Sequence, residues 1–316
     1  MPLISNSKSP VVPKLQGLHL FHFDGAPCAQ RVRFVLGEKG LKRGREVRFD
    51  ADNEVANQGQ NGHWISRSVS LIKKENMTQS YAQIHPNMVV PALVHDGRLY
   101  LESMDIIEYL DEAFGGSPFI PTDPVEREAA MQLVEQAKVM HLSLRYVSFH
   151  WSLGRLAMLN KKESTQLQDL AAQGNDDENL VSFYTAYSNN KIPQKVFDEH
   201  LINLYQAYQR LNTQLSDGRK FLMGDSLTIA DVFWAMKTLR LIETGYRFDV
   251  LHPELFQWYQ RIVARPAFQN EVMAKNRLLN RVWRSKAAIE RSLGFGLHHA
   301  LKKLITVQSG GIKRTI

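Results

Sequence analysis

The chain has 316 residues, of which 44% are hydrophobic and 22% are charged. This length predicts about two domains, and the ordinary composition excludes global disorder and a fibrous fold. No run of 18 apolar residues occurs, so we expect no membrane-spanning helix. The single cysteine, Cys28, excludes an internal disulfide and a multi-cysteine metal site. We therefore expect no metal centre and a reducing, cytoplasmic location.

The net charge of +7 is unevenly distributed along the chain. Residues 275–316 hold ten Lys and Arg and one acid, so this segment carries +9 and the remainder carries −2. Such a basic segment is a weak indication of an acidic partner or a membrane surface. At the other end, residues 1–16 are polar and contain Pro2, Pro10 and Pro13. They lack the apolar core of a secretory signal, and we expect a flexible N-terminus there.

The first predicted elements form a strand, a helix and a second strand. Leu18–His22 is a short apolar run, and Gly25 and Pro27 interrupt the loop that follows it. Apolar residues then recur at helical spacing over Cys28–Gly40, and Glu46–Phe49 indicates another strand. This order predicts a βαβ unit with parallel strands.

A long polar segment and a hairpin follow. Asp50–Pro86 is polar, and we expect one helix in it, near Met77–Ile84. Val89–Val94 and Leu99–Leu101 indicate two strands, because the Asp96-Gly97 pair between them favours a hairpin turn. A helix over Ser103–Phe114 completes the order of a thioredoxin-like domain. We assign that domain to residues 17–116, with an insertion within 51–86.

The second half of the chain has no strand pattern. Pro118, Pro121 and Pro124 mark a linker, and Pro124 suits the first turn of a helix. Helical spacing recurs over 124–151, 194–215, 228–244, 253–264 and 266–280, whereas 161–190 is polar and expected to be irregular. The predicted fold is therefore α/β plus all-α, with a helical domain over 124–275 and a basic extension over 276–316.

Two motifs of the first domain suggest a peptide ligand. Pro91 opens a strand and lacks an N–H group, so it lies at an edge or a special turn. In thioredoxin-like domains this proline is usually cis, and the backbone of the preceding residue, Val90, then faces a ligand. Ser103 is expected to be the N-cap of the next helix, where its hydroxyl and free N–H groups attract a carboxylate. Glu102 could hold an ammonium group. The alternatives are an ordinary edge proline and simple helix capping.

Cys28 and Thr228 open two further helices. A thiol at a helix N-terminus, near Arg31 and Arg33, favours the thiolate form, although a small buried cysteine packing behind the helix fits equally well. Thr228 followed by Asp231 matches a capping box with Asp in place of Glu. We assign that second motif a structural role.

Together these motifs resemble the glutathione S-transferase superfamily over about residues 17–275. The matching stretches are LHLFHFDGAPCAQRVRFVLGEKGL, VVPALVHDGRLYLESMDIIEYLDEAF and FLMGDSLTIADVFWA. The resemblance implies glutathione as the cofactor. Val90, before the proposed cis-Pro91, would bind the cysteinyl backbone of glutathione, and Glu102 with Ser103 would bind its γ-glutamyl end.

Two segments resemble bacterial lignin β-etherases and glutathione-dependent dehalogenases: NNKIPQKVFDEHLINLYQAYQRLNTQL, and HPNMVVPALVHDGRLYLESMDIIEYLDEAF followed by PTDPVERE. The etherases displace a phenol from a β-aryl ether, and the dehalogenases displace halide from an aromatic ring with a cysteine at the position of Cys28. Omega-class chemistry would place the thiol at Ala26 and is not expected. No Tyr or Ser that could activate a thiol lies in the loop after the first strand. Residues that bind the glycine end cannot be assigned; Gln60, His63, Lys73 and Lys74 remain alternatives.

The aromatic substrate is expected along the first long helix of the second domain. His141, Arg145, Ser148, Phe149 and Ser152 share a three-and-four spacing there, with Tyr146 and Trp151 beside them. Arg145 or His141 could bind a leaving phenolate, whereas the alternative makes Phe149 and Trp151 core residues and Arg145 a surface charge. The resemblance also implies a homo- or heterodimer, and no nucleic-acid module is present.

The basic extension contains an amphipathic pattern. Apolar residues alternate with basic residues there and predict a helix; they are Leu278, Leu279, Val282, Trp283, Ile289 and Leu293. It could pack on its own body, contact a partner subunit or lie on an anionic membrane; packing on the body is the favoured interpretation. The rival to an enzyme is a transferase-fold interaction or membrane-associated protein.

Overall fold

The computed structural model describes residues 7–154, 158–172 and 178–312. Contacts divide the chain into two compact units. The first comprises Met1–Ser117, Leu156–Lys191 and Asn270–Lys275, and the second comprises Pro118–Arg155, Ile192–Gln269 and Asn276–Ile316. This division differs from the expected ranges 17–116 and 124–275, because residues 158–172, 178–191 and 270–275 make their contacts within the first unit.

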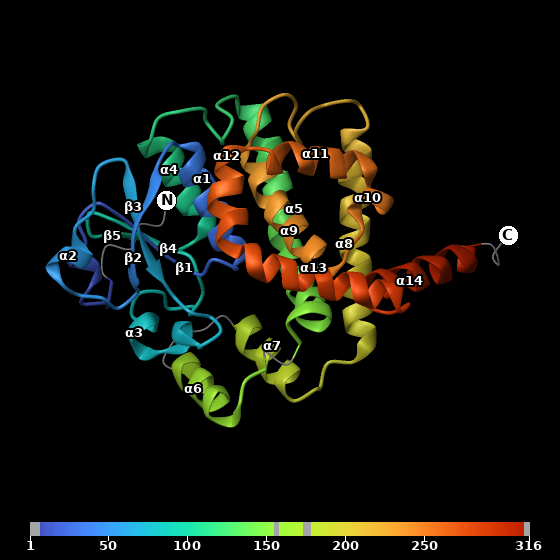
Figure 1. Ribbon diagram of the computed structural model, residues 1–316, viewed down its shortest axis with the longest axis horizontal. Coiled ribbons are helices and arrows are strands. Elements are labelled where there is room, and N and C mark those ends of the chain that lie inside the picture. Colours follow the sequence, from blue (N-terminus) through green and yellow to red (C-terminus); the bar gives the residue numbers. More distant parts are fainter. Residues whose placement is uncertain (1–6, 155–157, 173–177, 313–316) are drawn as a thin grey trace. The chain divides into compact units, whose positions relative to one another are not determined.

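The first unit is a mixed α/β structure (Figure 1). Its strands are β1 (Leu18–His22), β2 (Lys42–Arg48), β3 (His63–Ser68), β4 (Ala92–His95) and β5 (Arg98–Tyr100). Its helices are α1 (Pro27–Glu38), α2 (Glu54–Asn57), α3 (Gln79–Ala82), α4 (Ser103–Ala113), α6 (Lys161–Ala172) and α7 (Glu178–Ser188), with single 3-10 turns at Val12–Lys14 and Glu75–Met77. The expected thioredoxin-like element order is therefore confirmed, with additional elements.

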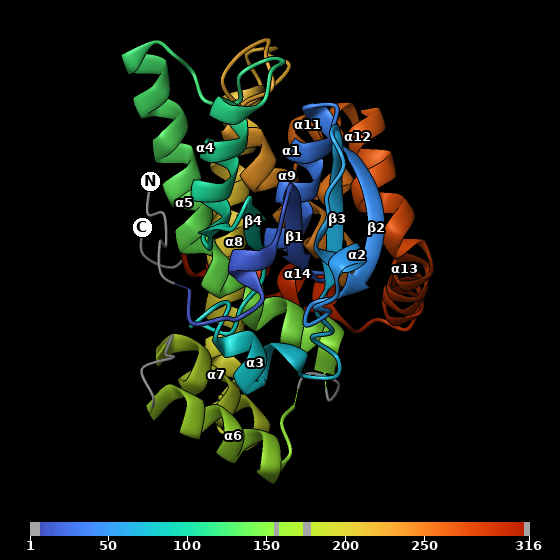
Figure 2. The same cartoon turned by 90° about the vertical axis from the view of Figure 1, so that its left-hand side faces the viewer.

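The five strands form one sheet in the order β2-β3-β1-β4-β5. β1 and β2 both run parallel to β3, so the two strands of the predicted βαβ unit are parallel but are not neighbours. β4 and β5 are antiparallel and form the predicted hairpin, in which Asp96 and Gly97 both have positive φ. Figure 2 shows β2 as the outer strand beside β3.

β3 lies inside the segment 50–86, where the sequence indicates only a helix. Its four central residues, 64–67, are buried although Ser66 and Arg67 are polar. Ser66 Oγ lies 2.8 Å from His22 Nε2 on β1, and Arg67 donates to His19 Nδ1 at 3.1 Å. Two of the buried residues of β3 are polar, and they are tolerated because residues distant in sequence supply their hydrogen-bond partners. The strand therefore lacks the pattern of apolar residues from which a buried strand is predicted. β2 is exposed and charged, as is usual for an edge strand that must not pair with other chains.

Arg67 also fixes the connection between β2 and β3. Its guanidinium donates to the carbonyl oxygens of Phe49, Ala51 and Ala56 and to Asn57 Oδ1, at 2.8–3.1 Å. Since successive strand residues point to opposite faces, Arg67 and Ser66 serve opposite sides of the sheet. One buried arginine on β3 thus holds the connection from β2 to β3 against the sheet.

Residues 7–16 are part of the core, in contrast to the expected flexible N-terminus. Val12 and Leu15 are buried in the hydrophobic cluster that includes Phe21 and Tyr81. Gln16 forms an isolated bridge to Gln58. Residues 1–6 lie outside the described part of the chain.

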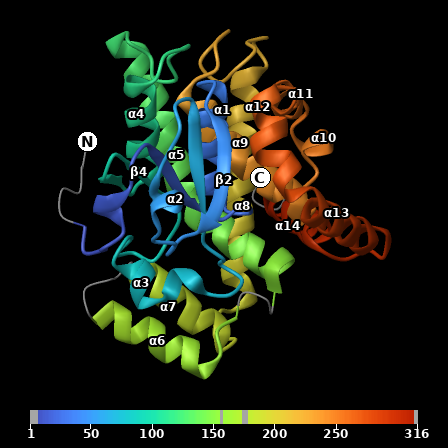
Figure 3. The ribbon, with the colours of Figure 1, turned by 60° about the vertical axis from the view of Figure 1, so that its left-hand side comes forward.

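The prediction that 161–190 is irregular is wrong, because this segment contains α6 and α7. Leu167 and Leu170 of α6 and Phe183 and Tyr187 of α7 are buried, while most other described side chains are half-buried or exposed. So sparse an apolar face gives a weak periodic signal. In Figure 3 the two helices lie beside α3, and Leu167 and Leu170 share a cluster with Met77.

The second unit is helical in the residues that the structure describes, apart from one isolated bridge. Its helices are α5 (Pro124–Ser148), α8 (Gln194–Leu215), α9 (Ile229–Thr244), α10 (Phe248–Leu251), α11 (Pro253–Val263), α12 (Pro266–Phe268), α13 (Arg277–Ser292) and α14 (Leu297–Ile312). A π-helical turn, Phe149–Leu153, ends α5. The helix predicted over 266–280 is instead interrupted at 269–276 by π and 3-10 turns.

α9 is the central helix of this unit, and nearly all of its residues are buried. It begins at the predicted capping box of Thr228 and Asp231. It ends at Gly245, whose φ of +102° suits a residue without a side chain. A Cβ atom on Gly245 would lie 3.1 Å from the Cβ of Ala287, so this glycine also permits the close approach of α13.

The basic extension folds partly onto its own unit. Trp283 and Ala287 of α13 are buried, and α13 contacts α9. The predicted amphipathic helix is confirmed, but Leu278, Val282, Ile289 and Leu293 form its exposed face. Among the described residues no helix is both long and apolar enough to cross a membrane.

Candidate functional site

The sheet register gathers three predicted site segments at one edge of the first unit. Phe21 on β1 pairs with Ala92 on β4, and Leu93 pairs with Tyr100 on β5. Residues 90–91, just before β4, and residues 102–103, just after β5, therefore lie beyond the same end of the sheet. β1 also ends there and leads into α1. The Val90-Pro91 peptide bond is cis, as expected.

Two buried side chains hold the segment before Pro91. Asn76 Nδ2 donates to the carbonyl oxygen of Met88 at 2.8 Å, and the Tyr81 hydroxyl donates to that of Val89 at 2.7 Å. Within the described residues, neither the N–H nor the C=O of Val90 takes part in a backbone–backbone hydrogen bond. The polar backbone groups of Val90 thus suit a peptide ligand.

Ser103 is not the N-cap of α4, contrary to the prediction. The N-cap is Glu102, whose extended backbone precedes the helix, and Ser103 is the first helical residue. The Ser103 side chain is buried, and its Oγ accepts a hydrogen bond from Arg31 Nη1 at 3.2 Å. Arg31 lies on α1, and α1 packs against α4. A buried guanidinium beside the start of α4 adds to the attraction of this helix end for a carboxylate.

Cys28 is the second residue of α1, after Pro27. It is a half-buried free thiol, and the helix has no acidic residue in its first turn and no side chain capping its N-terminus. The first N–H groups of α1 are therefore available near this thiol. This arrangement would stabilise a negative sulfur at the start of the helix.

Arg33, which the sequence suggested as a neighbour of Cys28, has another role. Its fully buried guanidinium donates to the carbonyl oxygens of Asp24 at 2.9 Å and Phe23 at 3.4 Å, and to Glu271 at 3.0 Å. Burial lowers the pKa of Arg33 to about 10. Burial, followed by the positive charge of Arg33, also lowers the pKa of His22 well below its usual value. Arg33 thus positions the loop that leads into Cys28.

The four alternatives for the glycine end occupy opposite ends of β3. Gln60 precedes β3 and His63 begins it, at the end of the sheet that is far from Pro91. Lys73 and Lys74 follow the end of β3 that pairs with His22, on the same side as the site. Lys74 lies 6.0 Å from the centre of the Tyr184 ring. The geometry therefore favours the two lysines.

The predicted substrate residues on α5 do not form one cluster. Lys237 Nζ on α9 lies 3.4 Å from His141 Nδ1. Tyr146 instead packs on α8, with ring centroids 4.1 Å from His200 and 5.9 Å from Phe197. Arg145 and Phe149 are half-buried at the C-terminal end of α5. His141 thus faces α9, and Tyr146 faces α8.

Ser148 serves the helix rather than a ligand, because its Oγ donates to the carbonyl oxygen of Leu144 at 2.7 Å. Ser152 is also buried, but its hydroxyl has no hydrogen-bond partner among the described residues. Trp151 packs edge-on against His150, whose ring stacks on Phe197.

The sequence analysis did not identify Lys237, which is fully buried in α9. A lysine within the apolar sequence FWAMKTLRLI was the available signal, because lysine is almost never fully buried without a partner. In the ranges that the structure describes, no group of three or more His, Cys, Asp or Glu side chains could hold a metal ion.

Comparison with known proteins identifies both halves of the fold. Residues 20–118 match the family model of the glutathione S-transferase N-terminal domain, and residues 178–266 match that of the C-terminal domain. The protein LigF of a Sphingobium species is 27% identical over 205 residues, covering 62% of this chain and 78% of LigF. The crystal structure of LigF, a β-etherase, superposes with a TM-score of 0.65 at 21% identity, covering 82% of this chain and 100% of LigF.

Two other proteins are similar. The tetrachloro-p-hydroquinone reductive dehalogenase of Sphingobium chlorophenolicum is 25% identical over 266 residues, covering 81% of this chain and 96% of the dehalogenase. A glutathione transferase from Burkholderia graminis superposes with a TM-score of 0.56 at 18% identity, covering 83% of this chain and 90% of that one. That structure contains two glutathione molecules per subunit.

Proposed function

Because this chain belongs to the glutathione S-transferase family, we propose that it uses glutathione to cleave an aromatic substrate. The leading reaction is cleavage of the β-aryl ether bond of a lignin-derived compound. One observation carries the proposal. Three segments lie beyond the same end of the sheet: residues 90–91, residues 102–103 and the start of α1. When bound there, glutathione supplies a thiol nucleophile.

The residues at this end of the sheet suit the two ends of a γ-glutamyl peptide. The N–H and C=O of Val90 bind the cysteinyl backbone, because they are not used in backbone pairing within the described chain. Ser103 and the first N–H groups of α4 bind the γ-glutamyl carboxylate, supported by the charge of Arg31. The exposed carboxylate of Glu102 binds the ammonium group.

Cys28 and the start of α1 stabilise the sulfur. The N–H groups of the first turn and the Cys28 S–H are the donors that the described residues provide at this helix end. Ether cleavage then forms one C–S bond and breaks one C–O bond, and the phenol leaves with a proton. On the side of the aromatic substrate we propose His141, Arg145, Tyr146 and Phe149, with His141 or Arg145 binding the phenolate.

Reductive dehalogenation is the second candidate, and the thiol of Cys28 favours it. In that reaction an aryl halide and two thiols give the arene, a disulfide and hydrogen halide. A cysteine at the site could take part in the thiol–disulfide exchange. The similarity to the Sphingobium dehalogenase supports this chemistry. For either reaction we propose a cytoplasmic dimer.

Calorimetric titration with glutathione tests the site. We expect a dissociation constant between micromolar and low millimolar for the unaltered protein. Ser103→Ala removes one hydrogen-bonding group facing a carboxylate, so affinity should fall about 10-fold or more. Ser80→Ala changes an exposed serine on α3 and should leave affinity unchanged. Equal affinity in both variants would remove Ser103 from the site, and no binding by the unaltered protein would favour the interaction-protein alternative.

Product analysis separates the two reactions. The protein is incubated with glutathione and either a β-aryl ether ketone or a chlorinated hydroquinone, and thioether, phenol, chloride and disulfide are measured. Thioether with phenol identifies ether cleavage, whereas chloride with disulfide identifies dehalogenation. Cys28→Ala should abolish dehalogenation and retain glutathione binding. Full dehalogenation in that variant would leave no chemical role for Cys28.

A further inference from the structure

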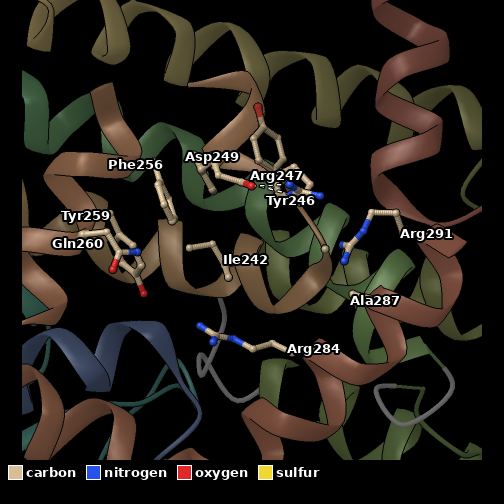
Figure 4. A pocket seen from close by; sticks show the side chains of 12 residues that line it. Ile242, Tyr246, Arg247, Asp249, Phe256, Tyr259, Gln260, Arg284, Ala287 and Arg291 are labelled. Carbon is tan, nitrogen blue, oxygen red and sulfur yellow. Dashed lines mark hydrogen bonds and ion pairs between the residues drawn. The ribbon is translucent and has the colours of Figure 1, made fainter. Parts of the chain in front are cut away.

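The second unit contains a cavity of about 320 Å³ that is lined by the C-terminal end of α9 and by residues of α10, α11 and α13 (Figure 4). Every lining residue belongs to the second unit. The proposed function does not use this cavity. α13, which belongs to the basic extension, contributes one side of it.

The cavity has an aromatic wall. Tyr246 and Phe248 are buried, with ring centroids 4.5 Å apart, and Phe256 and Ile242 line the same space. Flat, apolar side chains of this kind suit an aromatic ring in the ligand.

The opposite side of the cavity is cationic. Arg284 and Arg291 project from α13, and Figure 4 shows both side chains extending toward the other labelled residues. Arg247 also lines the cavity but forms an ion pair with Asp249. Within residues 7–154, 158–172 and 178–312, no ion pair or hydrogen bond is found for the guanidinium of Arg284 or of Arg291. Two positive charges therefore face the cavity.

Two acids that interact electrostatically with these arginines are already engaged. Glu243 is buried, and its Oε2 lies 3.3 Å from Arg240 Nη1. Asp249 is paired with Arg247. Glu243 attracts Arg284 electrostatically and Asp249 attracts Arg291, but among the described residues neither carboxylate forms an ion pair or hydrogen bond with these arginines. An added anion could therefore bind without displacing an existing pair.

A buried hydroxyl gives independent support for a polar ligand. Tyr259 is 2% exposed and lines the cavity, yet its hydroxyl has no hydrogen-bond partner. A buried polar group without a partner costs about 1–3 kcal/mol, and an acceptor in the cavity would remove that cost. Gln260, on the next position of α11, adds a further polar side chain.

We propose that this cavity binds a small aromatic acid, at a site separate from that of glutathione. The ring contacts Tyr246 and Phe256, and the carboxylate or sulfonate pairs with Arg284 and Arg291. The Tyr259 hydroxyl donates to an oxygen of the ligand. The cavity lies within the range of small-molecule sites, and the aromatic wall favours an aryl acid over inorganic phosphate.

Fluorescence titration with anilinonaphthalene sulfonate tests the site in the full-length protein saturated with glutathione. Arg284→Gln combined with Arg291→Gln should weaken binding at least 10-fold. The matched control combines Arg277→Gln with Arg281→Gln, which removes two exposed charges of α13 that do not line the cavity. It should change binding less than twofold. Equal binding by the variant that lacks Arg284 and Arg291 and by the control would overturn the proposal.

Competition experiments use the unaltered protein and do not depend on how the variants fold. 2-Naphthoate should displace the probe, and its neutral analogue 2-naphthamide should not. Displacement by both compounds to the same extent would mean that no anion is recognised, and would refute the site. Ser103→Ala should leave probe binding unchanged, so failure of the glutathione site and failure of this site give different results.

Discussion

Replacing Asp231 at the start of α9 should destabilise the protein strongly. The buried carboxylate accepts four hydrogen bonds. Oδ1 accepts from the Leu222 N–H and the Trp258 Nε1–H, both at 2.8 Å, and Oδ2 accepts from the Thr228 N–H at 2.8 Å and the Thr228 hydroxyl at 3.1 Å. In Asp231→Ala, three buried N–H groups lose their acceptor. At about 1–3 kcal/mol each, offset in part by local relaxation, we expect a loss of about 4 kcal/mol.

Asp231→Asn distinguishes the hydrogen bonds from the space that the side chain fills. The amide oxygen can still accept from Leu222 and Trp258, whereas its NH₂ group faces the Thr228 N–H, so we expect a loss of about 2 kcal/mol. The control is Asp225→Ala, because Asp225 is exposed and its ion pair with Lys220 should contribute less than about 0.5 kcal/mol.

Urea denaturation followed by tryptophan fluorescence measures all three variants. The expected order of stability is Asp225→Ala, then Asp231→Asn, then Asp231→Ala. If Asp231→Ala lost less than about 1 kcal/mol, or if Asn were as damaging as Ala, the hydrogen bonds would not carry the stability assigned to them.

Three buried histidines should make the protein sensitive to acid: burial lowers the pKa to about 4 for His19, His85 and His252. Between pH 6.5 and 4 the unfolded chain binds more protons than the folded chain, so the free energy of unfolding should decrease as the pH is lowered through this window. The expected loss is up to about 2 kcal/mol per histidine at pH 5. Equal urea midpoints at pH 7 and pH 5 would contradict this. Gly245→Ala should cost more stability than Gly218→Ala, because both have positive φ but only Gly245 lies against Ala287; equal melting temperatures would show that Ala287 yields without cost. Arg33→Met should lower stability by about 3 kcal/mol and weaken glutathione binding, since buried carbonyl groups lose their donor; unchanged affinity would mean that the Phe23–Asp24 loop does not depend on Arg33.

The sequence analysis correctly predicted those helices and turns whose conformation is determined by residues close together in the chain. α8 begins and ends where the apolar spacing predicted, and the bounds of α9 follow from its capping box and Gly245. The hairpin turn at Asp96-Gly97 was also predicted. In these cases the residues that determine the conformation are neighbours in sequence. The cis form of Pro91 was instead expected from the thioredoxin-like fold, with an ordinary edge proline as the alternative, and the cis bond is present.

The missed features depend on partners that are distant in sequence. β3 contains buried Ser66 and Arg67, which are tolerated because β1 and the α2 segment supply their hydrogen-bond partners. Arg31 reaches Ser103 from a residue 72 positions away, and Lys237 reaches His141 from 96 positions away. Pairwise contacts of this kind leave no periodic pattern, so only the fold reveals them.

The strand order has a consequence for how the sheet assembles. β1 pairs with β3, so Leu18 must find Trp64 after α1, β2 and α2 have been traversed, whereas β4 and β5 are joined by a two-residue turn. Because closing a long loop costs entropy before any pairing is gained, we expect the β4–β5 hairpin to form early and the β1–β3 ladder late. Until β3 pairs with β1, the backbone N–H and C=O groups along that edge of β1 have no partner strand. Newly synthesised chains should be most prone to associate with one another during that interval.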